Sequence, residues 1–135
     1  MGTRSLTHVY HDDKVILTLY RQFDGYPEGL GLDLAKFLDG FVVVNGFGIK
    51  NPEKCANGMG CLAAQLVCHL KDGVGNVYIY PVESKDCDEE YVYHIRHEEG
   101  IGLTIEIRDA DNKKLTLKGT PKALLSAIPK LQHDS

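Results

Sequence analysis

The chain has 135 residues, of which 43% are hydrophobic and 25% are charged, with a formal net charge of -4. This length suits one domain with a real core and is too short for two ordinary domains, and the composition is that of a globular protein. The acidic balance argues against a nucleic-acid partner, because phosphate binding needs a net basic face. We therefore expect a single domain over residues 1–135.

The first segments of the chain predict a β-hairpin. Residues 5–10 and 15–23 are rich in β-branched and aromatic side chains, and the polar stretch 11–14 separates them. Residues 24–31 follow with three glycines and a proline, a composition typical of a structured loop whose backbone can adopt positive φ or approach a ligand closely.

The middle of the chain predicts two helices. In the first, Leu30, Leu34, Phe37 and Leu38 recur at helical spacing, and residues 39–40 end it. Residues 41–44 fit either a buried extension of this helix or a short strand, and residues 45–60 read as a second long loop. The second helix carries its apolar face on residues 62–70, with Gly73 expected as its C-terminal cap.

The last third of the chain predicts four strands in a meander and a closing helix. The expected strands are 77–82, 91–97, 101–108 and 115–117. Pro121 opens the final helix, and Pro129 predicts its kink or early end. Strands grouped beside helices indicate an α+β fold, a single domain whose mainly antiparallel sheet, made of the hairpin and the meander, packs with two to three helices.

Cysteine and histidine spacing argues against metal or redox chemistry. The four cysteines form no C-x-x-C pair, so we expect reduced core residues. His94 and His97 should lie on opposite faces of a strand, and a metal would need further ligands from elsewhere. We expect no metal and no cofactor.

The entry to the second helix is the first candidate for ligand binding. Gly58, Gly60 and Ala63 match G-x-G-x-x-A, but residues 50–56 look loop-like where a dinucleotide-binding fold would need a strand. Free amides at a helix start, reached through glycines, suit a phosphate or carboxylate. The alternative is a tight loop that needs glycine for backbone reasons alone.

The end of the hairpin is the second candidate. Arg21 can bind an anion with its guanidinium, Gln22 and Asp24 can bind hydroxyl or amide groups, and Tyr20 or Tyr26 can stack on a planar ring. The alternative is an Arg21–Asp24 ion pair that only fastens the loop.

Our hypothesis is that both segments converge on one cavity and bind a small phosphate-bearing ligand. The ligand-binding residues are then Arg4, Tyr20, Arg21, Gln22, Asp24, Tyr26, Asn57, Gly58, Met59 and Gly60.

Four stretches of the sequence also resemble a known group of proteins: residues 2–7 (GTRSLT), 20–29 (YRQFDGYPEG), 57–65 (NGMGCLAAQ) and 90–93 (EYVY). Together they resemble a family of small uncharacterised proteins of bacteriophages and large DNA viruses, over most of residues 2–97. Phage proteins of this size include sponges that sequester nucleotide immune signals of the host, so the resemblance implies a possible relation to that class.

The leading expectation is thus a phage-encoded protein that sequesters a nucleotide-derived signal without converting it. We expect it in the cytoplasm, that of the host if the protein is viral, with no membrane partner, because its apolar runs are too short to span a bilayer and its start has no secretory signal. We also expect a homo-oligomer, because an exposed apolar sheet face would favour association of copies around a ligand. The alternatives are a hydrolase of such a signal, with Asp24, Glu28 or a histidine as base, and a protein that inhibits a host enzyme.

Overall fold

The computed structural model describes residues 2–47, 52–109 and 113–131, and these form one six-stranded and one two-stranded sheet with three α-helices. The six-stranded sheet has the order β5-β2-β1-β6-β7-β8, with bounds Ser5–His11 (β1), Lys14–Arg21 (β2), Val77–Tyr80 (β5), Tyr91–Glu98 (β6), Gly102–Asp109 (β7) and Lys114–Gly119 (β8). The helices are Leu32–Leu38 (α1), Met59–Leu70 (α2) and Pro121–Ala127 (α3). The two-stranded sheet pairs Val42–Val44 (β3) with Cys55–Asn57 (β4).

Three shorter helical turns complete the elements. A π-helix, Pro27–Gly31 (η1), precedes α1, and 3-10 turns occupy Pro52–Lys54 (η2) and Ile128–Lys130 (η3). The expected turn at 109–113 and the middle of the expected loop at 45–60 include residues outside the described ranges.

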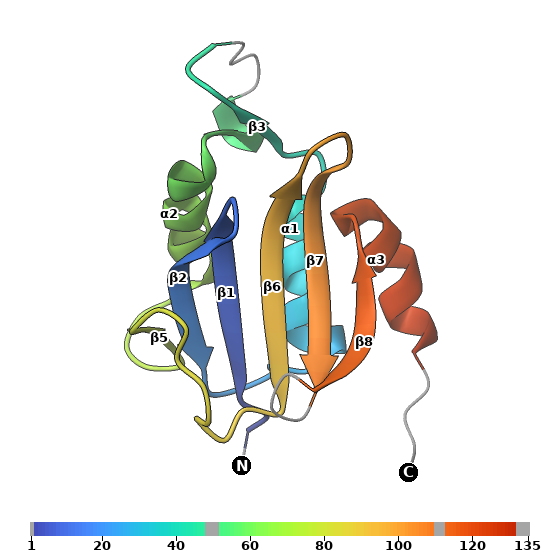
Figure 1. Ribbon diagram of the computed structural model, residues 1–135. Coiled ribbons are helices and arrows are strands. Elements are labelled where there is room, and N and C mark those ends of the chain that lie inside the picture. Colours follow the sequence, from blue (N-terminus) through green and yellow to red (C-terminus); the bar gives the residue numbers. More distant parts are fainter. Residues whose placement is uncertain (1, 48–51, 110–112, 132–135) are drawn as a thin grey trace.

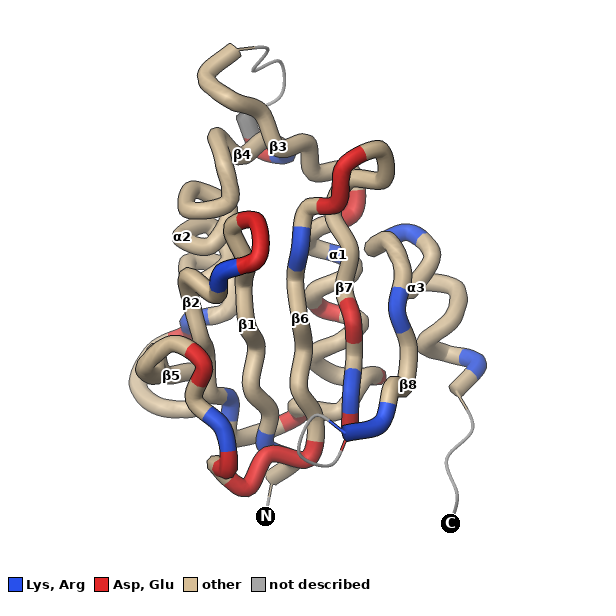
Figure 2. The backbone as a smooth tube through the Cα atoms, in the orientation of Figure 1, with Lys and Arg blue, Asp and Glu red and all other residues tan. Residues whose placement is uncertain are grey.

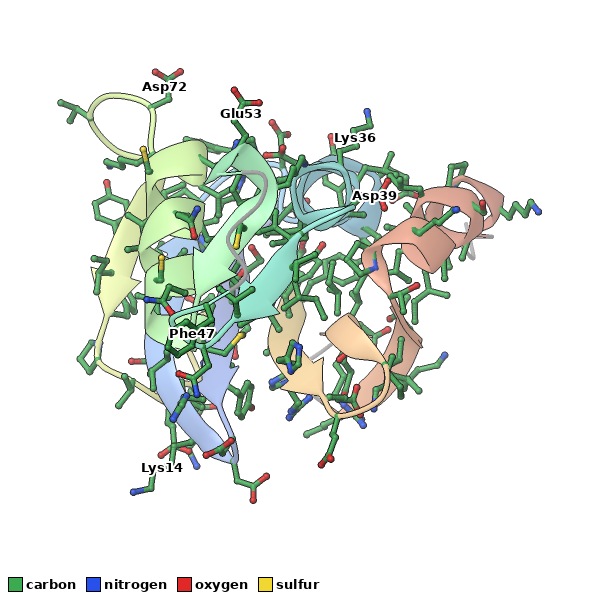
Figure 3. All side chains as sticks on the ribbon, turned by 90° about the horizontal axis from the view of Figure 1, so that it is seen from above. Lys14, Lys36, Asp39, Phe47, Glu53 and Asp72 are labelled. Carbon is green, nitrogen blue, oxygen red and sulfur yellow. The ribbon has the colours of Figure 1, made fainter. Side chains whose placement is uncertain are left out.

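All three α-helices cover the same face of the large sheet (Figures 1 and 3). Because successive strand residues point to opposite faces, Val9 of β1 and Ile95 of β6 enter the core, where they meet Leu34 of α1 and Leu66 of α2. The opposite face, which we call the open face, carries no helix formed by the described residues. The segment between β5 and β6, residues 81–90, reaches over part of it (Figure 1).

The α+β prediction is confirmed, as are the hairpin, the three helices and the strand character of the last third of the chain. Residues 41–44 turn out to contain a short strand rather than a helical extension. The final helix ends early, since α3 stops at Ala127 and continues as a 3-10 turn around Pro129.

The prediction that the last four strands of the large sheet form a meander was wrong. Only β6, β7 and β8 follow one another in the sheet, whereas β5 lies at the far edge beside β2. The strand β6 instead runs parallel to β1, with His8 opposite His94. The free edge of β2 accepts β5 because Tyr20 stacks on Tyr80 there, with ring centroids 4.8 Å apart.

Two details at α2 also differ from expectation. The helix is capped at Lys71, so Gly73 is not the C-cap. A strand, β4, does lead into Gly58, where residues 50–56 had been read as loop. Because β4 pairs with β3 in a separate two-stranded sheet, and the large sheet is mainly antiparallel, this unit is not a dinucleotide-binding fold.

Candidate functional site

The two sequence-predicted segments lie at opposite ends of the molecule. Gly58 borders a hollow of about 440 Å³ together with Asp12 of the β1–β2 turn. Arg21 is at the other end of β2, which spans about 23 Å at the usual rise of a strand. The hypothesis that both segments form one cavity was therefore wrong, because the hairpin that links them separates its turn from its ends by a full strand length.

At the hairpin end, the side chains hold the loop together. The Nε of Arg21 donates to the carbonyl of Phe23 at 2.7 Å, and no Arg21–Asp24 ion pair is seen in the described structure. Gln22 accepts a hydrogen bond from the amide of Asn76, and Tyr26 donates to Asp24 at 3.4 Å. These contacts favour a local structural role for the segment.

The other two residues predicted near this end also have protein partners. Arg4 lies 3.7 Å from Asp88, an exposed pair. Tyr20 is buried on the open face, where it packs with Leu6 and Val92 and stacks on Tyr80.

At the start of α2, backbone geometry explains the glycine. Gly58 has φ +85 and ψ 169, a conformation open essentially to glycine alone, and its amide donates to the carbonyl of Val44. The side-chain oxygen of Asn57 accepts from the amide of Gly46, and Met59 is a core residue. A Cβ at Gly60 would meet nothing within 4 Å. The observations at Gly58 favour the tight-loop alternative.

A continuous row of polar side chains crosses the open face instead. Strand pairing places one residue from each of the six strands side by side: Tyr80, Thr18, His8, His94, Glu106 and Lys118. Thr18, His8, His94 and Glu106 are all buried, with relative exposures between 0% and 9%. Burying a polar side chain costs free energy unless it forms hydrogen bonds. Four adjacent buried polar side chains on one sheet face therefore indicate an organised polar site.

A cavity of about 230 Å³, which we call the histidine cavity, opens above this row. Its floor consists of open-face side chains: Leu6, His8, Tyr10, Val92 and His94, with Val15 at one side. Its wall comes from the segment between β5 and β6, namely Glu83, Ser84, Lys85, Asp86 and Glu89. Acidic residues gather on this segment (Figure 2).

Hydrogen bonds determine which ring nitrogen of His8 carries the proton. The hydroxyl of Thr18 accepts from the amide of Glu83 at 3.1 Å and lies 2.8 Å from Nδ1 of His8. Because that hydroxyl is buried and has one proton to donate, we assign Nδ1 as the acceptor and place the ring proton on Nε2. The Nε2 atom has no hydrogen-bond partner in the described part of the chain.

The pKa of His8 is lowered from 6.5 to about 4, first because burial disfavours the charged ring and then because His94 and Arg96 lie nearby. His8 is therefore neutral at physiological pH and presents an uncharged N–H donor in the cavity.

The second histidine is held by aromatic and polar contacts. His94 stacks on His8, with ring centroids 5.4 Å apart, and its Nδ1 lies 2.8 Å from the hydroxyl of Tyr10. Burial raises the pKa of Tyr10, which keeps its hydroxyl protonated. The guanidinium of Arg96 lies 4.1 Å from the centre of the Tyr10 ring, a cation–π contact that fixes the position of both side chains.

Beside the cavity, Glu106 lies between two arginines. Its two oxygens accept from Nη1 of Arg96 at 3.2 Å and from Nε of Arg108. Burial alone would raise the pKa of Glu106, but the hydrogen bond and charge of Arg108, with His94 and Arg96, bring that pKa below its ordinary value. Glu106 is therefore a carboxylate at neutral pH.

The cavity lining decides what the site can bind. Its wall holds three carboxylates against one ammonium group, and its histidine at position 8 is neutral, so the lining is acidic overall. No group of three or more His, Cys, Asp or Glu side chains suited to a metal occurs among residues 2–47, 52–109 and 113–131. A larger hollow of about 700 Å³ between α2 and β2 is lined by Leu17, Ala63, Val67 and Ile79 with few polar groups, and so does not suit a polar ligand.

Sequence reasoning missed the residues of this site: His8, Tyr10, His94, Arg96, Glu106 and Arg108. One signal was present, because each of the three strands carries two polar side chains at i and i+2, the spacing of a single strand face. What joins them is the parallel pairing of β1 with β6, which are separated by some eighty residues of chain.

In the described residues, no helix is both long and apolar enough to cross a lipid bilayer. Comparison of the chain with protein-family models, with curated proteins and with solved structures found no match. What the protein does has to be inferred from the chemistry of its own site.

Proposed function

We propose that this protein binds a small polar molecule in the histidine cavity and does not convert it chemically. The observation that carries the proposal is the His8 Nε2–H donor, oriented by Thr18 and left without a partner among the described residues. Ligand pockets combine apolar walls with a few placed polar groups of this kind. Leu6, Val15 and Val92 supply the apolar part here.

The cavity indicates the size and charge of the ligand. About 230 Å³ is below the usual range for drug-sized molecules, so one sugar or one heterocyclic ring fits it. The carboxylates of Glu83, Asp86 and Glu89 would repel a phosphate inside the cavity. An uncharged group with a hydrogen-bond acceptor for His8 is the best complement.

The chemistry of the lining favours binding over catalysis. A general base works best when its pKa is close to the working pH, and the pKa of His8 near 4 makes it a weak base at neutral pH. The Ser84 hydroxyl donates to the carbonyl of Pro81 and is thus occupied within its own turn. An activated serine would instead be paired with an imidazole.

The biological role that we propose for this binding is sequestration of a nucleotide-derived signal, with its base or its sugar in the cavity. The homo-oligomeric state remains part of this proposal, and light scattering coupled to size-exclusion chromatography measures it.

The test is a ligand screen by amide NMR against nucleosides, monosaccharides, cyclic dinucleotides and cyclic ADP-ribose isomers, followed by calorimetry. Three proteins are compared: the unmodified chain, His8→Leu, which removes the cavity donor, and Arg21→Ala, which alters the sequence-predicted segment. We expect shifts confined to β1, β6 and residues 83–89, with binding weakened about tenfold or more by His8→Leu and unchanged by Arg21→Ala.

The outcomes separate the alternatives. Loss of binding in Arg21→Ala alone would move the site to the end of the hairpin. Chromatography of the ligand after protein denaturation distinguishes storage from turnover, because a changed product would make the protein a hydrolase. Absence of binding across the whole panel would contradict the proposal.

A further inference from the structure

The pair of arginines beside the histidine cavity holds more positive charge than its protein partner neutralises. Arg96 and Arg108 both contact the single carboxylate of Glu106, so the three side chains together carry one net positive charge. A guanidinium has five N–H donors, and Glu106 takes one from each arginine. The arginine side chains remain 31% and 32% exposed.

This cluster is contiguous with the cavity. Glu106 lies directly opposite His94 in the β6–β7 pair, and Arg108 is paired with Val92, so both are neighbours of cavity-floor residues. The guanidinium of Arg96 stacks on the ring of Tyr10, a third residue of the floor. The Tyr10 ring and the Glu106 carboxylate therefore hold the arginines in place before any ligand arrives.

The charge distribution of the open face is complementary to a ligand with two different ends. The wall of the cavity is acidic, whereas lysine and arginine residues appear along β7 and β8 (Figure 2). Lys118 lies opposite Glu106 on β8, but its ammonium is 3.7 Å from the carboxylate of Glu98, so the two arginines are the cations of the cluster. Arginine forks bind phosphate and carboxylate oxygens with paired hydrogen bonds.

We propose that Arg96 and Arg108 form a subsite for one oxyanion, a phosphate monoester or a carboxylate, of a ligand whose uncharged part occupies the histidine cavity. This inference rests on the proposed function and narrows its ligand to a molecule such as a nucleoside monophosphate or a sugar phosphate. The acidic wall excludes the anion from the cavity itself, and the arginine pair accepts it outside.

Inorganic phosphate tests the subsite without the cavity ligand. Arginine Nε–Hε NMR signals are followed while phosphate, or chloride at equal ionic strength, is added. We expect saturable shifts of Arg96 and Arg108 with phosphate only, absent in Arg108→Gln and retained in Lys122→Gln, which makes the same charge change on an exposed residue of α3. Equal responses to phosphate and chloride would overturn the subsite.

Matched probes then link the subsite to the cavity. Adenosine and adenosine monophosphate, and ribose and ribose 5-phosphate, are compared by calorimetry. We expect the phosphorylated member of at least one pair to bind about tenfold more tightly or better, and Arg108→Gln to remove that gain without changing the affinity of the uncharged member.

The results distinguish this inference from the proposed function. Binding of an uncharged member with no gain from phosphate overturns the subsite and leaves the cavity proposal standing. Absence of binding by every member, with His8 signals unmoved, overturns both. Should Arg108→Gln fold poorly because Glu106 loses a partner, Arg108→Lys keeps the charge beside Glu106 and removes the paired N–H donors, and we expect it to lose most of the phosphate gain.

Discussion

Acid should destabilise this protein through His8, and the size of the effect follows from the structure. The folded chain holds the ring neutral with a pKa of about 4, whereas the unfolded chain takes up a proton near the ordinary value of 6.5. Between these two values the unfolded state binds more protons, so stability falls as the pH falls through that window. Above the window, both states are neutral at this residue and no penalty exists.

The full pKa difference corresponds to about 3 kcal/mol, at about 1.4 kcal/mol for each pH unit. A change from about pH 7 to about pH 4.5 crosses most of the window, and the ring borders a solvent-accessible cavity, which reduces the penalty. We therefore expect about 2 kcal/mol of unfolding free energy to be lost through His8 over this range.

The assay is urea denaturation followed by far-UV circular dichroism at both pH values. His8→Asn removes the titration and keeps a side-chain oxygen where Nδ1 accepts from Thr18. Other groups, Glu106 among them, titrate in both proteins, so the difference between the two pH dependences isolates His8. His11→Asn is the matched control, because His11 ends the same strand with an exposed side chain.

Equal losses of stability in the unmodified chain and in His8→Asn would refute the reasoning. An NMR titration of the His8 ring gives an independent reading. A midpoint near 6.5, or a proton found on Nδ1 instead of Nε2, would show that the Thr18 hydrogen bond does not hold the ring as described.

Three further substitutions test the local geometry by chemical denaturation at neutral pH. Thr18→Val leaves the Glu83 amide and the His8 ring without their shared hydroxyl, and we expect a loss of about 1–3 kcal/mol, whereas a loss below about 0.5 kcal/mol would argue against the bridge. Gly58→Ala should lower the free energy of unfolding by about 1–3 kcal/mol, because Gly58 has a positive φ. Gly60→Ala, in the first turn of α2 where a Cβ meets nothing, should leave that free energy unchanged or raise it by up to about 1 kcal/mol. Similar effects at both positions would contradict this account.

Local patterns in the sequence predicted the three α-helices and the six strands of the large sheet, but left residues 41–44 undecided and missed β4. The apolar spacing of residues 62–70 and the alternation in residues 91–97 each determine one element, because helix and strand periodicities differ. Pro121 and Pro129 mark the start and the end of α3 through the missing amide and the fixed φ of proline. These signals act within a few residues, so they can be read without the fold.

The site could not be read in the same way. Glycine-rich stretches suit two different roles, because glycine lets a ligand approach the backbone and also adopts positive φ. At Gly58 the structure shows the second role, a backbone with φ +85. The hairpin also separates Arg21 from Gly58 by the length of a strand, which composition does not reveal.

The sequence by itself determined the class of the fold and the positions of the three α-helices and of the six strands of the large sheet. Its i, i+2 spacing also places Tyr10 on the same strand face as His8, and Arg96 on the same strand face as His94. Only the tertiary structure decided that β1 pairs with β6 and that β5 crosses to the far edge, which carries residues 81–90 over the open face. The physical reason is that strand partners are selected by packing and edge complementarity over long chain separations, and the histidine cavity exists only once that selection is made.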